Sequence, residues 1–395
     1  MMLGFLLARA GIDVAVLEKH EDFLRDFRGD TVHPSTLEVI HELGLLDAFL
    51  KRPHQEIRQL GGHIGGEEVI VSDFTHLPTR CRFVAFMPQW EFLDFLAEHG
   101  HRYPTFQVRM RTEVTGLIED NGHVVGVRAT TPEGPLDIRA ELSVGADGRH
   151  SVVRNQAGLI VEDLGAPIDV LWMRLSRSPH DPEQTLGYLT GGQALVMLQR
   201  GDYWQCGLVI AKGAYTEVRR TGIEALRERI AMIVPFMRDR VGELRQWDDV
   251  RLLTVLVDRL RQWYRPGLLC IGDAAHAMSP VGGVGINLAI QDAVAAANIL
   301  AEPLRRGAPS IDDLDAVQRR RGLPTRLTQR VQLLVQNRVL TRAVRETPRQ
   351  LPLILRLLRR WPVLRRVPAR MIGIGFRPEH VKTPDAWTSG DGEMG

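Results

Sequence analysis

The sequence predicts a mixed α/β fold (α+β mixed) in which an antiparallel sheet is inserted between two parts of a parallel one. At the front, a helix, a glycine and a short apolar strand follow one another in residues 1–17, as in a βαβ unit. Residues 170–210 carry short alternating segments that are typical of antiparallel strands. At the back, an apolar strand, a glycine-rich turn and a long apolar helix occupy residues 268–300. If front and back share one sheet, the middle sheet folds as a second layer.

The composition is that of an ordinary globular protein. The 395 residues are 44% hydrophobic and 25% charged, and the formal net charge is only +2, so we expect no global field that attracts nucleic acid. The three cysteines are widely spaced and odd in number, which argues against a disulfide framework or a cysteine metal site and favours a cytoplasmic location. No apolar run reaches the roughly 18 residues that span a bilayer, and the first residues lack the basic region of a signal peptide.

Breakers and apolar spacing predict the helices. Met1–Ala10 has helical composition and ends before Gly11, and Ile12–Leu17 is an apolar run that predicts a buried strand. Pro34 is an entry signal for a helix with apolar spacing at 36–43. Further helical segments are expected at 45–50, 89–99, 222–234 and 286–300, and the residues beyond 300 are expected to be helical and basic.

Turn signals predict two antiparallel regions. Asn121-Gly122 and residues 132–135 mark the turns of a small meander, and residues 200–202 join two strands of a denser sheet. The meander strands are expected at 108–115, 123–130 and 136–144. The other strands are expected at 170–175, 185–189, 194–199, 203–210, 252–257 and 268–271.

Glu18 is the first candidate site residue. An acid at the end of the second strand of a dinucleotide fold binds ribose hydroxyls, although a solvated strand end is an equally good interpretation of one acid. The glycine fingerprint G-x-G-x-x-G, which should precede the first helix, is absent, as is the first strand.

The second candidate site is the strand-to-helix turn at residues 144–154. Gly145 and Gly148 permit a tight backbone after a strand. Asp147 can accept hydrogen bonds from a ribose or from backbone amides, and Arg154 can fix the turn. A capped turn without a ligand is the alternative.

The third candidate site, residues 268–292, carries the most specific signal. Gly272 and Asp273 end a strand, and an open loop with several glycines then leads to a helix that starts near Ile286. Backbone N–H groups at such a helix N-terminus stabilise negative charge, which a reduced flavin carries on its ring. Asp273 suits polyol hydroxyls, and Asn287 can donate and accept in the first helical turn. The loop is longer than a plain connection needs.

These residues match a known family. The segment GDAAH at 272–276, followed by Pro280, Gly282, Gly285 and Asn287, closely resembles the flavin-binding segment of class A flavoprotein monooxygenases, the family of p-hydroxybenzoate hydroxylase. The turn at 145–154 resembles the family's Asp-Gly motif, and the resemblance covers about residues 1–330. Arg28 matches an arginine near the flavin, and Gln89 matches a glutamine that contacts the cofactor. The cofactor-binding residues expected in all are Glu18, Arg28, Gln89, Asp147, Gly148, Arg154, Gly272, Asp273, Pro280, Gly282, Gly283, Gly285, Ile286 and Asn287.

The resemblance implies a p-hydroxybenzoate hydroxylase-like FAD-binding fold and an oxidoreductase. NADH or NADPH would reduce the FAD, and a flavin C4a-hydroperoxide would then hydroxylate an aromatic or polyketide-like small molecule with O2. No metal and no catalytic dyad are expected, because the flavin carries the chemistry. His276 is expected to have a structural or cofactor-shell role. A prenyl reductase of the same superfamily and a non-catalytic remnant stay open, whereas the Trp-x-Trp-x-Ile signature of halogenases is absent.

The sequence departs from the family at its start. Because the glycine loop is missing, we expect either that the recorded start lies downstream of the true one, which we favour, or that the chain is truncated. Loss of a buried parallel strand would open the sheet and leave ladder groups unpaired. The hypothesis is that this 395-residue form binds FAD poorly, which visible flavin absorbance at one FAD per chain would refute.

Domain boundaries and the basic C-terminal region complete the predictions. We expect 1–165 and 249–330 to form the two parts of the FAD-binding domain, 166–248 the substrate-binding sheet with a contribution from 55–80, and 331–395 a helical cap and tail. Residues 319–370 contain 15 Arg and one acid, Glu346. A packed cap with solvated arginines is favoured over a weakly membrane-bound helix, because prolines interrupt the segment. Nucleic-acid binding is a weaker third alternative, because aromatic residues are sparse in this region.

Overall fold

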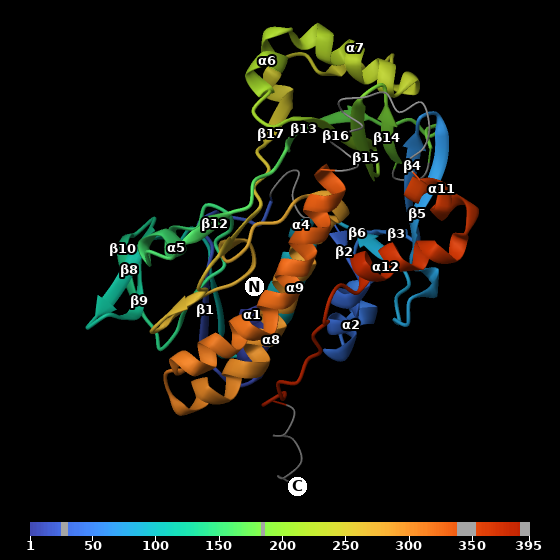
Figure 1. The fold of residues 1–395 in the computed structure, drawn as a ribbon. Coiled ribbons are helices and arrows are strands. Elements are labelled where there is room, and N and C mark those ends of the chain that lie inside the picture. The colour runs from blue at the N-terminus through green and yellow to red at the C-terminus, as the bar shows by residue number, and fades with distance from the viewer. Residues whose placement is uncertain (25–30, 183–185, 338–352, 388–395) are drawn as a thin grey trace.

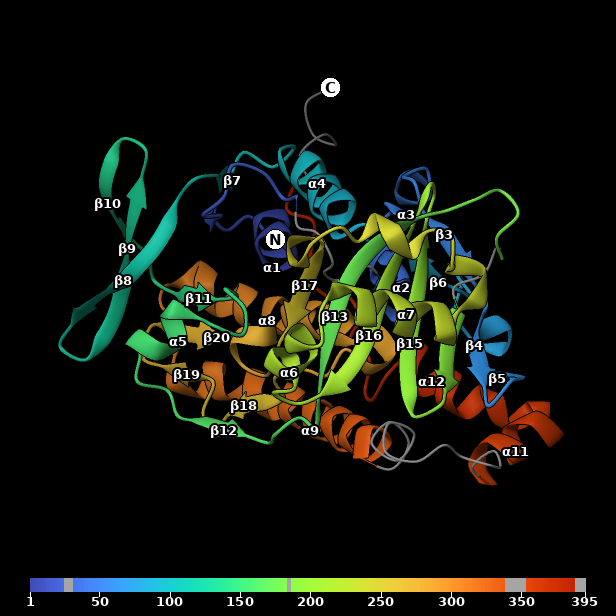
Figure 2. The same ribbon diagram turned by 90° about the horizontal axis from the view of Figure 1, so that it is seen from above.

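The structure is a computed structural model, and it describes residues 1–24, 31–182, 186–337 and 353–387. Arg28, one of the predicted cofactor residues, lies outside the described residues. Figures 1 and 2 show a parallel layer with its helices on one side of the molecule and a large, mostly antiparallel sheet on the other.

Two parallel strand pairs form the first layer. β1 (Val14–Leu17) pairs with β7 (Phe106–Arg109), and β11 (Ser143–Gly145) pairs with β20 (Leu268–Cys270). The second pair joins residues that precede the middle sheet to residues that follow it, so the middle sheet is an insertion in the chain. Strand β1 at the front lies in a separate two-stranded sheet, so the front does not share the sheet of β20 as expected. Helices α1 (Met2–Arg9) and α8 (Gly285–Arg306) contact each other and contribute to the same apolar core.

β1 is less buried than the sequence predicts. Its side chains are half-buried and Ala15 is exposed, so the prediction of a buried strand is wrong. Within the described residues β1 pairs only with β7, because the two parallel pairs belong to separate sheets. Val16 of β1 and Val144 of β11 line one cavity, which places an open space between the two pairs.

The meander exists, but its first strand was placed wrongly. β8 (Glu113–Asp120), β9 (His123–Thr131) and β10 (Gly134–Arg139) form a three-stranded antiparallel sheet. The predicted strand at 108–115 is split, because Val108 belongs to β7 and Arg111 adopts a positive φ of 49° between the two strands. The predicted third strand at 136–144 also ends early, since Val144 belongs to β11.

A seven-stranded sheet forms the second layer, as predicted for the middle of the chain. Its order is β17-β13-β16-β15-β14-β4-β5. The strands are β17 (Val250–Leu253), β13 (Ile168–Ser176), β16 (Tyr203–Ala211), β15 (Gln193–Arg200), β14 (Leu186–Thr190), β4 (Gln59–Ile64) and β5 (Glu67–Asp73). The predicted strand at 252–257 therefore begins earlier and ends at Leu253, and the β4–β5 hairpin was not predicted as strands.

Alternation along β13 gives this sheet two different faces. Leu171, Met173 and Leu175 are buried with the apolar side of α7 (Ile223–Ile233). Val170 and Trp172 point to the other face and line the cavity described below.

The remaining elements connect and cover these layers. The other helices are α2 (Pro34–Glu42), α3 (Leu46–Phe49), α4 (Gln89–Gly100), α5 (Val152–Gln156), α6 (Tyr215–Arg220), α9 (Ile311–Val335), α11 (Leu353–Arg360) and α12 (Arg366–Gly373). The other strands are β2 (Thr31–Val32), β3 (Gln55–Ile57), β6 (Val84–Phe86), β12 (Val161–Asp163), β18 (Asp258–Leu260) and β19 (Tyr264–Arg265). Short 3-10 helices are η1 (Phe74–His76), η2 (Pro235–Met237), η3 (Val241–Glu243), η4 (Trp247–Asp249), η5 (Gly272–Ala274), η6 (Val281–Gly283) and η8 (Pro362–Arg365).

Helix α8 lies at the centre of the molecule. The stretch Val281–Arg306 is long and apolar enough to cross a membrane, but 67% of its most apolar window is buried inside the protein, as in a core helix. Figure 1 shows α8 and α9 side by side, and the two helices are in contact.

Candidate active site

One continuous cavity of about 2510 Å³ extends from the N-terminus of α8 to the inner face of the seven-stranded sheet. Pockets for one small ligand usually measure ~300–1,000 Å³, so this cavity has room for a dinucleotide together with a second molecule. The parallel layer contributes one wall, and β13 to β16 with β4 contribute the opposite wall.

Most of the predicted cofactor residues line this cavity although they are far apart in the sequence. They are Glu18, Gln89, Asp147, Gly148, Gly272, Asp273, Pro280, Gly282, Gly283, Gly285 and Ile286. Arg154 and Asn287 are buried behind the cavity wall, where each holds the backbone of other segments. Met1 and Met2, at the start of α1, also line the cavity.

Asn287 holds the glycine-rich loop at residues 280–285, which we name the flavin-type loop, against α2. Its Oδ1 atom accepts hydrogen bonds from the backbone N–H of His33 at 2.8 Å and from the Thr36 hydroxyl at 2.7 Å. Its amide nitrogen donates to the backbone oxygen of Thr31 at 3.2 Å. Both ends of this buried side chain are therefore used within the protein, which makes Asn287 a positioning residue for the loop.

The Asp-Gly turn at residues 145–154 is capped by a side chain and is bonded to η5 of the GDAAH segment. Asp147 accepts hydrogen bonds from the Ser151 hydroxyl at 2.5 Å and from the backbone N–H of Val153 at 3.2 Å, so it caps α5. Arg154 donates to the backbone oxygens of Arg149 at 2.5 Å and Ala274 at 3.4 Å. The arginine thus fixes its own turn, as its position predicts, and also joins this turn to η5.

The loop before α8 has a conformation that requires glycine. Gly283 has a φ of +62°, and a Cβ atom there would lie 2.6 Å from the hydroxyl oxygen of Thr31. That hydroxyl donates to the backbone oxygen of Gly283 at 2.8 Å. At Gly285, by contrast, a Cβ atom would meet nothing within 4 Å, because the residue borders the cavity. The first turn of α8 therefore faces open space, with its N–H groups available to a negatively charged ring edge.

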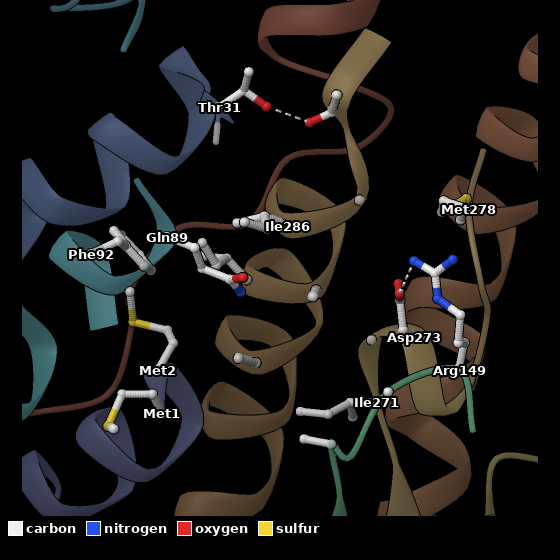
Figure 3. A pocket seen from close by; sticks show the side chains of 18 of the residues that line it. Met1, Met2, Thr31, Gln89, Phe92, Arg149, Ile271, Asp273, Met278 and Ile286 are labelled. Atoms are coloured by element: carbon white, nitrogen blue, oxygen red, sulfur yellow. Dashed lines mark hydrogen bonds and ion pairs between the residues drawn. The ribbon is translucent and has the colours of Figure 1, made fainter. Parts of the chain in front are cut away.

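One side chain beside this loop, Arg149, has no role predicted from the sequence. Figure 3 shows Arg149 and Asp273 facing one another at the cavity, and their closest charged atoms are 3.8 Å apart. Arg149 lies inside the Asp-Gly motif, but a lone arginine in a turn is usually a solvated charge, so its position gave no usable signal. On the other side of α8, Gln89 from the start of α4 points toward Ile286 (Figure 3).

A buried cluster of charges lies behind the turn at residues 272–276, which we name the motif turn. Asp292 of α8 accepts from the backbone N–H of Gly272 at 3.1 Å, contacts the His276 ring at 2.5 Å, and pairs with Arg321 of α9 at 3.0 Å. Arg321 also pairs at 3.2 Å with Glu379, near the end of the described chain. Burial raises the pKa of Asp292, but the charges and hydrogen bonds of His276 and Arg321 outweigh it and leave the pKa below its ordinary value.

His276 therefore belongs to the scaffold of the motif turn, because its ring is 1% exposed and bonds to Asp292. The sequence does not predict roles for Arg321 and Glu379, because charges of opposite sign that are distant in sequence show no pattern before the chain folds.

His33 gives the site an expected pH dependence. Its ring is buried, its Nδ1 atom lies 2.7 Å from the backbone oxygen of Ile372 in α12, and burial lowers its pKa to about 4. As pH falls below about 6.5, the unfolded chain binds a proton that the folded chain does not, so stability should drop by up to about 3 kcal/mol on approach to pH 4.

Urea unfolding at several pH values measures this effect. The variant His33→Gln should lose most of this acid-dependent fall, whereas His20→Gln, at an exposed position, should keep it. Equal pH dependence in wild type and His33→Gln would contradict the prediction.

The residues present fit a bound flavin on three grounds of this structure. The cavity is large enough, Gly285 leaves space that a Cβ atom would fill, and the α8 N-terminus and Asp273 offer the donors and acceptor that a flavin ring and its polyol chain require. Such a fold and cavity define a dinucleotide-binding flavoprotein.

Comparison with known proteins identifies the family. The model of the family described as "FAD binding domain" matches residues 1–331. The chain belongs to this family of FAD-dependent aromatic monooxygenases. The chain is 34% identical over 385 residues to 6-methylpretetramide 4-monooxygenase of Streptomyces rimosus, covering 97% of this chain and 91% of that protein. It is 28% identical over 304 residues to 12-dehydrotetracycline 5-monooxygenase/anhydrotetracycline 6-monooxygenase of S. rimosus, covering 74% of this chain but 59% of that protein. Several other curated relatives are likewise matched over only 60–64% of their own length.

Solved structures show the same fold. The anhydrotetracycline hydroxylase OxyS from S. rimosus superposes with a TM-score of 0.74 at 24% identity, covering 94% of this chain and 73% of that one. PqsL from Pseudomonas aeruginosa, described as a probable FAD-dependent monooxygenase, gives a TM-score of 0.72 at 21% identity, covering 87% of this chain and 94% of that one. The predicted p-hydroxybenzoate hydroxylase-like fold is confirmed.

Proposed function

We propose that this chain is a single-component monooxygenase that uses FAD, NADH or NADPH, and O2 to hydroxylate an aromatic or polyketide-like molecule. The balanced reaction consumes NAD(P)H, a proton, O2 and the substrate C–H bond, and yields NAD(P)+, water and a C–OH product. FAD would supply the two-electron and oxygen chemistry when bound beside the α8 N-terminus. The chain's own residues would bind the cofactor, orient the substrate and exclude water.

The observation that carries this proposal is that one cavity joins the flavin-type loop to the apolar face of the seven-stranded sheet. We name the part of the cavity beside that sheet the chamber. Its wall on the sheet is mostly apolar, and Tyr188 stacks on His63 at 5.1 Å between ring centroids beside it. The chamber residues on the sheet are Val170, Trp172, Tyr188, Ala194, Val196, Leu198, Gln205, Gly207 and Val209. Such a wall suits a planar fused-ring molecule, for which each Å² of buried apolar area contributes about 25 cal/mol.

The names of two relatives support the substrate class. The relatives with 34% and 28% identity are named for oxygenation of pretetramide and tetracycline compounds, which are fused-ring polyketides. We propose the same class of substrate for this chain, with residues 166–248 and the β4–β5 hairpin as the substrate-binding unit.

A direct assay tests the reaction. The protein with added FAD should oxidise NADH or NADPH faster when a fused-ring phenolic substrate is present, and the product should contain one oxygen atom from 18O2. Oxidation without any oxygenated product across a panel of such substrates would overturn the proposal. Reduction of a substrate double bond without O2 uptake would instead indicate a reductase.

The chamber predicts one specific variant. A Cβ atom at Gly207 would lie 2.9 Å from the Trp172 ring, so Gly207→Ala should push that ring into the chamber. Overpacking of this kind costs about 1–3 kcal/mol, so we expect KM for a fused-ring substrate to rise about tenfold or more with unchanged flavin content. Gly242→Ala is the matched control, because a Cβ atom there meets nothing within 4 Å. An unchanged KM in Gly207→Ala would place the substrate elsewhere.

A further inference from the structure

The segment formed by α11, η8 and α12 is both strongly basic and incompletely packed. Between Leu353 and Arg370 it contains six arginines and no acidic residue. Figures 1 and 2 show it at the outer edge of the molecule, beside β4 and β5. Leu355 and Leu358 are buried against Val69 of β5, so the predicted packed cap is present on one side of the segment.

The packed contact uses only part of the apolar arc of α11. Successive residues of an α-helix are about 100° apart, so Leu355 and Leu358 lie within one narrow sector. Ile354 and Trp361 fall in the adjoining sector, and Trp361 continues the last turn through a 2.8 Å bond from its N–H to the Leu357 oxygen. Leu353 lies farther round, on the side of the helix opposite the packed contact. The side chains of Leu353, Ile354 and Trp361 are 64%, 57% and 52% exposed. Half of the apolar arc therefore faces outward.

The following turn and helix continue the exposed apolar side chains. Val363 of η8 and Val367 of α12 are 57% and 60% exposed. Soluble proteins rarely leave several large apolar side chains exposed in one short segment unless that surface contacts something.

Arginines are interleaved with these apolar residues. Arg359 pairs with Glu67 of β5, but within the described part of the chain no acidic side chain pairs with the other exposed arginines of the segment. We define the basic apolar surface as Leu353, Ile354, Trp361, Val363 and Val367 with Arg356, Arg360, Arg366 and Arg370.

We propose that the basic apolar surface binds peripherally to membranes that contain anionic lipid. Exposed aliphatic and Trp side chains among arginines are the composition of helices that lie at the lipid interface. Each basic residue near an anionic bilayer contributes about 1 kcal/mol to the binding free energy, and each unpaired arginine of this surface would make such a contribution. A two-fold contact with a second copy of this chain would instead place arginines opposite arginines, which is unfavourable.

The location of the surface gives the contact a function. Ile354 and Val367 belong to the basic apolar surface and also line the cavity, next to the buried Leu355 and Leu358. A docked surface would therefore place the rim of the chamber at the lipid boundary, where an apolar substrate can enter without crossing water. Membrane binding itself does not depend on the proposed reaction and is tested without it.

Sedimentation with vesicles tests the proposal. The full chain should bind vesicles of phosphatidylcholine and phosphatidylglycerol at least tenfold better than phosphatidylcholine alone. Raising salt from about 0.1 M to about 1 M shortens the Debye length from ~10 to ~3 Å and should remove most of that preference. Equal binding to both vesicles, or a preference insensitive to salt, would overturn the proposal.

Paired variants separate surface-specific binding from general charge. Arg360→Gln/Arg366→Gln should weaken binding to the anionic vesicles about tenfold or more, at roughly 1 kcal/mol for each arginine removed. Arg219→Gln/Arg220→Gln removes the same charge from exposed positions on α6 and should bind like wild type. Equal weakening by both variants would refute a specific surface.

A second variant tests the apolar part of the contact. Trp361→Ser/Val363→Ser should lower binding to anionic vesicles while leaving far-UV circular dichroism unchanged, because both side chains are exposed. Unchanged vesicle binding together with loss of a concentration-dependent dimer, or of binding to an acidic protein, would assign the surface to a protein partner and refute the lipid proposal.

Discussion

Replacing Arg321 by methionine is expected to cost about 3–5 kcal/mol in the free energy of unfolding. Arg321 is 0% exposed and lies between two buried carboxylates, Asp292 at 3.0 Å and Glu379 at 3.2 Å. Methionine fills a similar volume but leaves the Asp292 charge with His276 as its remaining side-chain partner. The loss is mainly the cost of that uncompensated buried charge, since a buried ion pair contributes little net stability by itself.

Urea unfolding of two further variants checks the cause. Arg320→Met is the matched control, because Arg320 binds the same Glu379 at 2.6 Å but its side chain is 30% exposed; about 1 kcal/mol is expected there. Arg321→Met/Asp292→Asn should recover part of the loss, because the second change removes the isolated charge. Equal losses for Arg321→Met and Arg320→Met would show that burial of the charge is not the cause.

The same cluster is a feature that a local sequence pattern does not predict. Asp292 ends the motif segment and could be noticed there, but its partners lie on α9 and near residue 379. The packing of α9 against α8 brings Arg321 to Asp292, so no local sequence pattern predicts the cluster. The motif glycines and Asp273, in contrast, are close in sequence, and their turn chemistry was readable before folding.

The fold divides in the same way. Helix α2 and the strands from β13 to β16 follow from local alternation, breakers and helical spacing, and the structure has them within a few residues of the predicted positions. The β4–β5 hairpin does not follow from the local sequence, because Gly61 and Gly62 interrupt the strand pattern of β4. The structure explains those glycines, since a Cβ atom at Gly62 would lie 2.2 Å from the backbone oxygen of Gly187 in β14. A tertiary contact, invisible in the local sequence, dictates them.

The second large effect is expected at the loop before α8, where two glycines have different reasons to be glycine. Gly283→Ala should destabilise the protein without cofactor, because it combines a φ of +62° with a Cβ atom 2.6 Å from the Thr31 hydroxyl. A left-handed non-glycine residue alone costs about 1–2 kcal/mol. Distortion of the loop should also weaken FAD binding by at least tenfold.

Gly285→Ala separates loop strain from occupancy of the cavity by the cofactor. A Cβ atom at Gly285 meets no protein atom within 4 Å, so the stability of the protein without cofactor should not fall. If the flavin ring lies against the first turn of α8, the added methyl occupies its space and FAD affinity should still fall about tenfold or more. Titration of each variant with FAD, followed by flavin fluorescence, measures the affinity, and urea unfolding without FAD measures the stability. Wild-type FAD affinity in Gly285→Ala would place the flavin away from α8, because a ring in contact with that turn cannot accommodate the methyl group without moving.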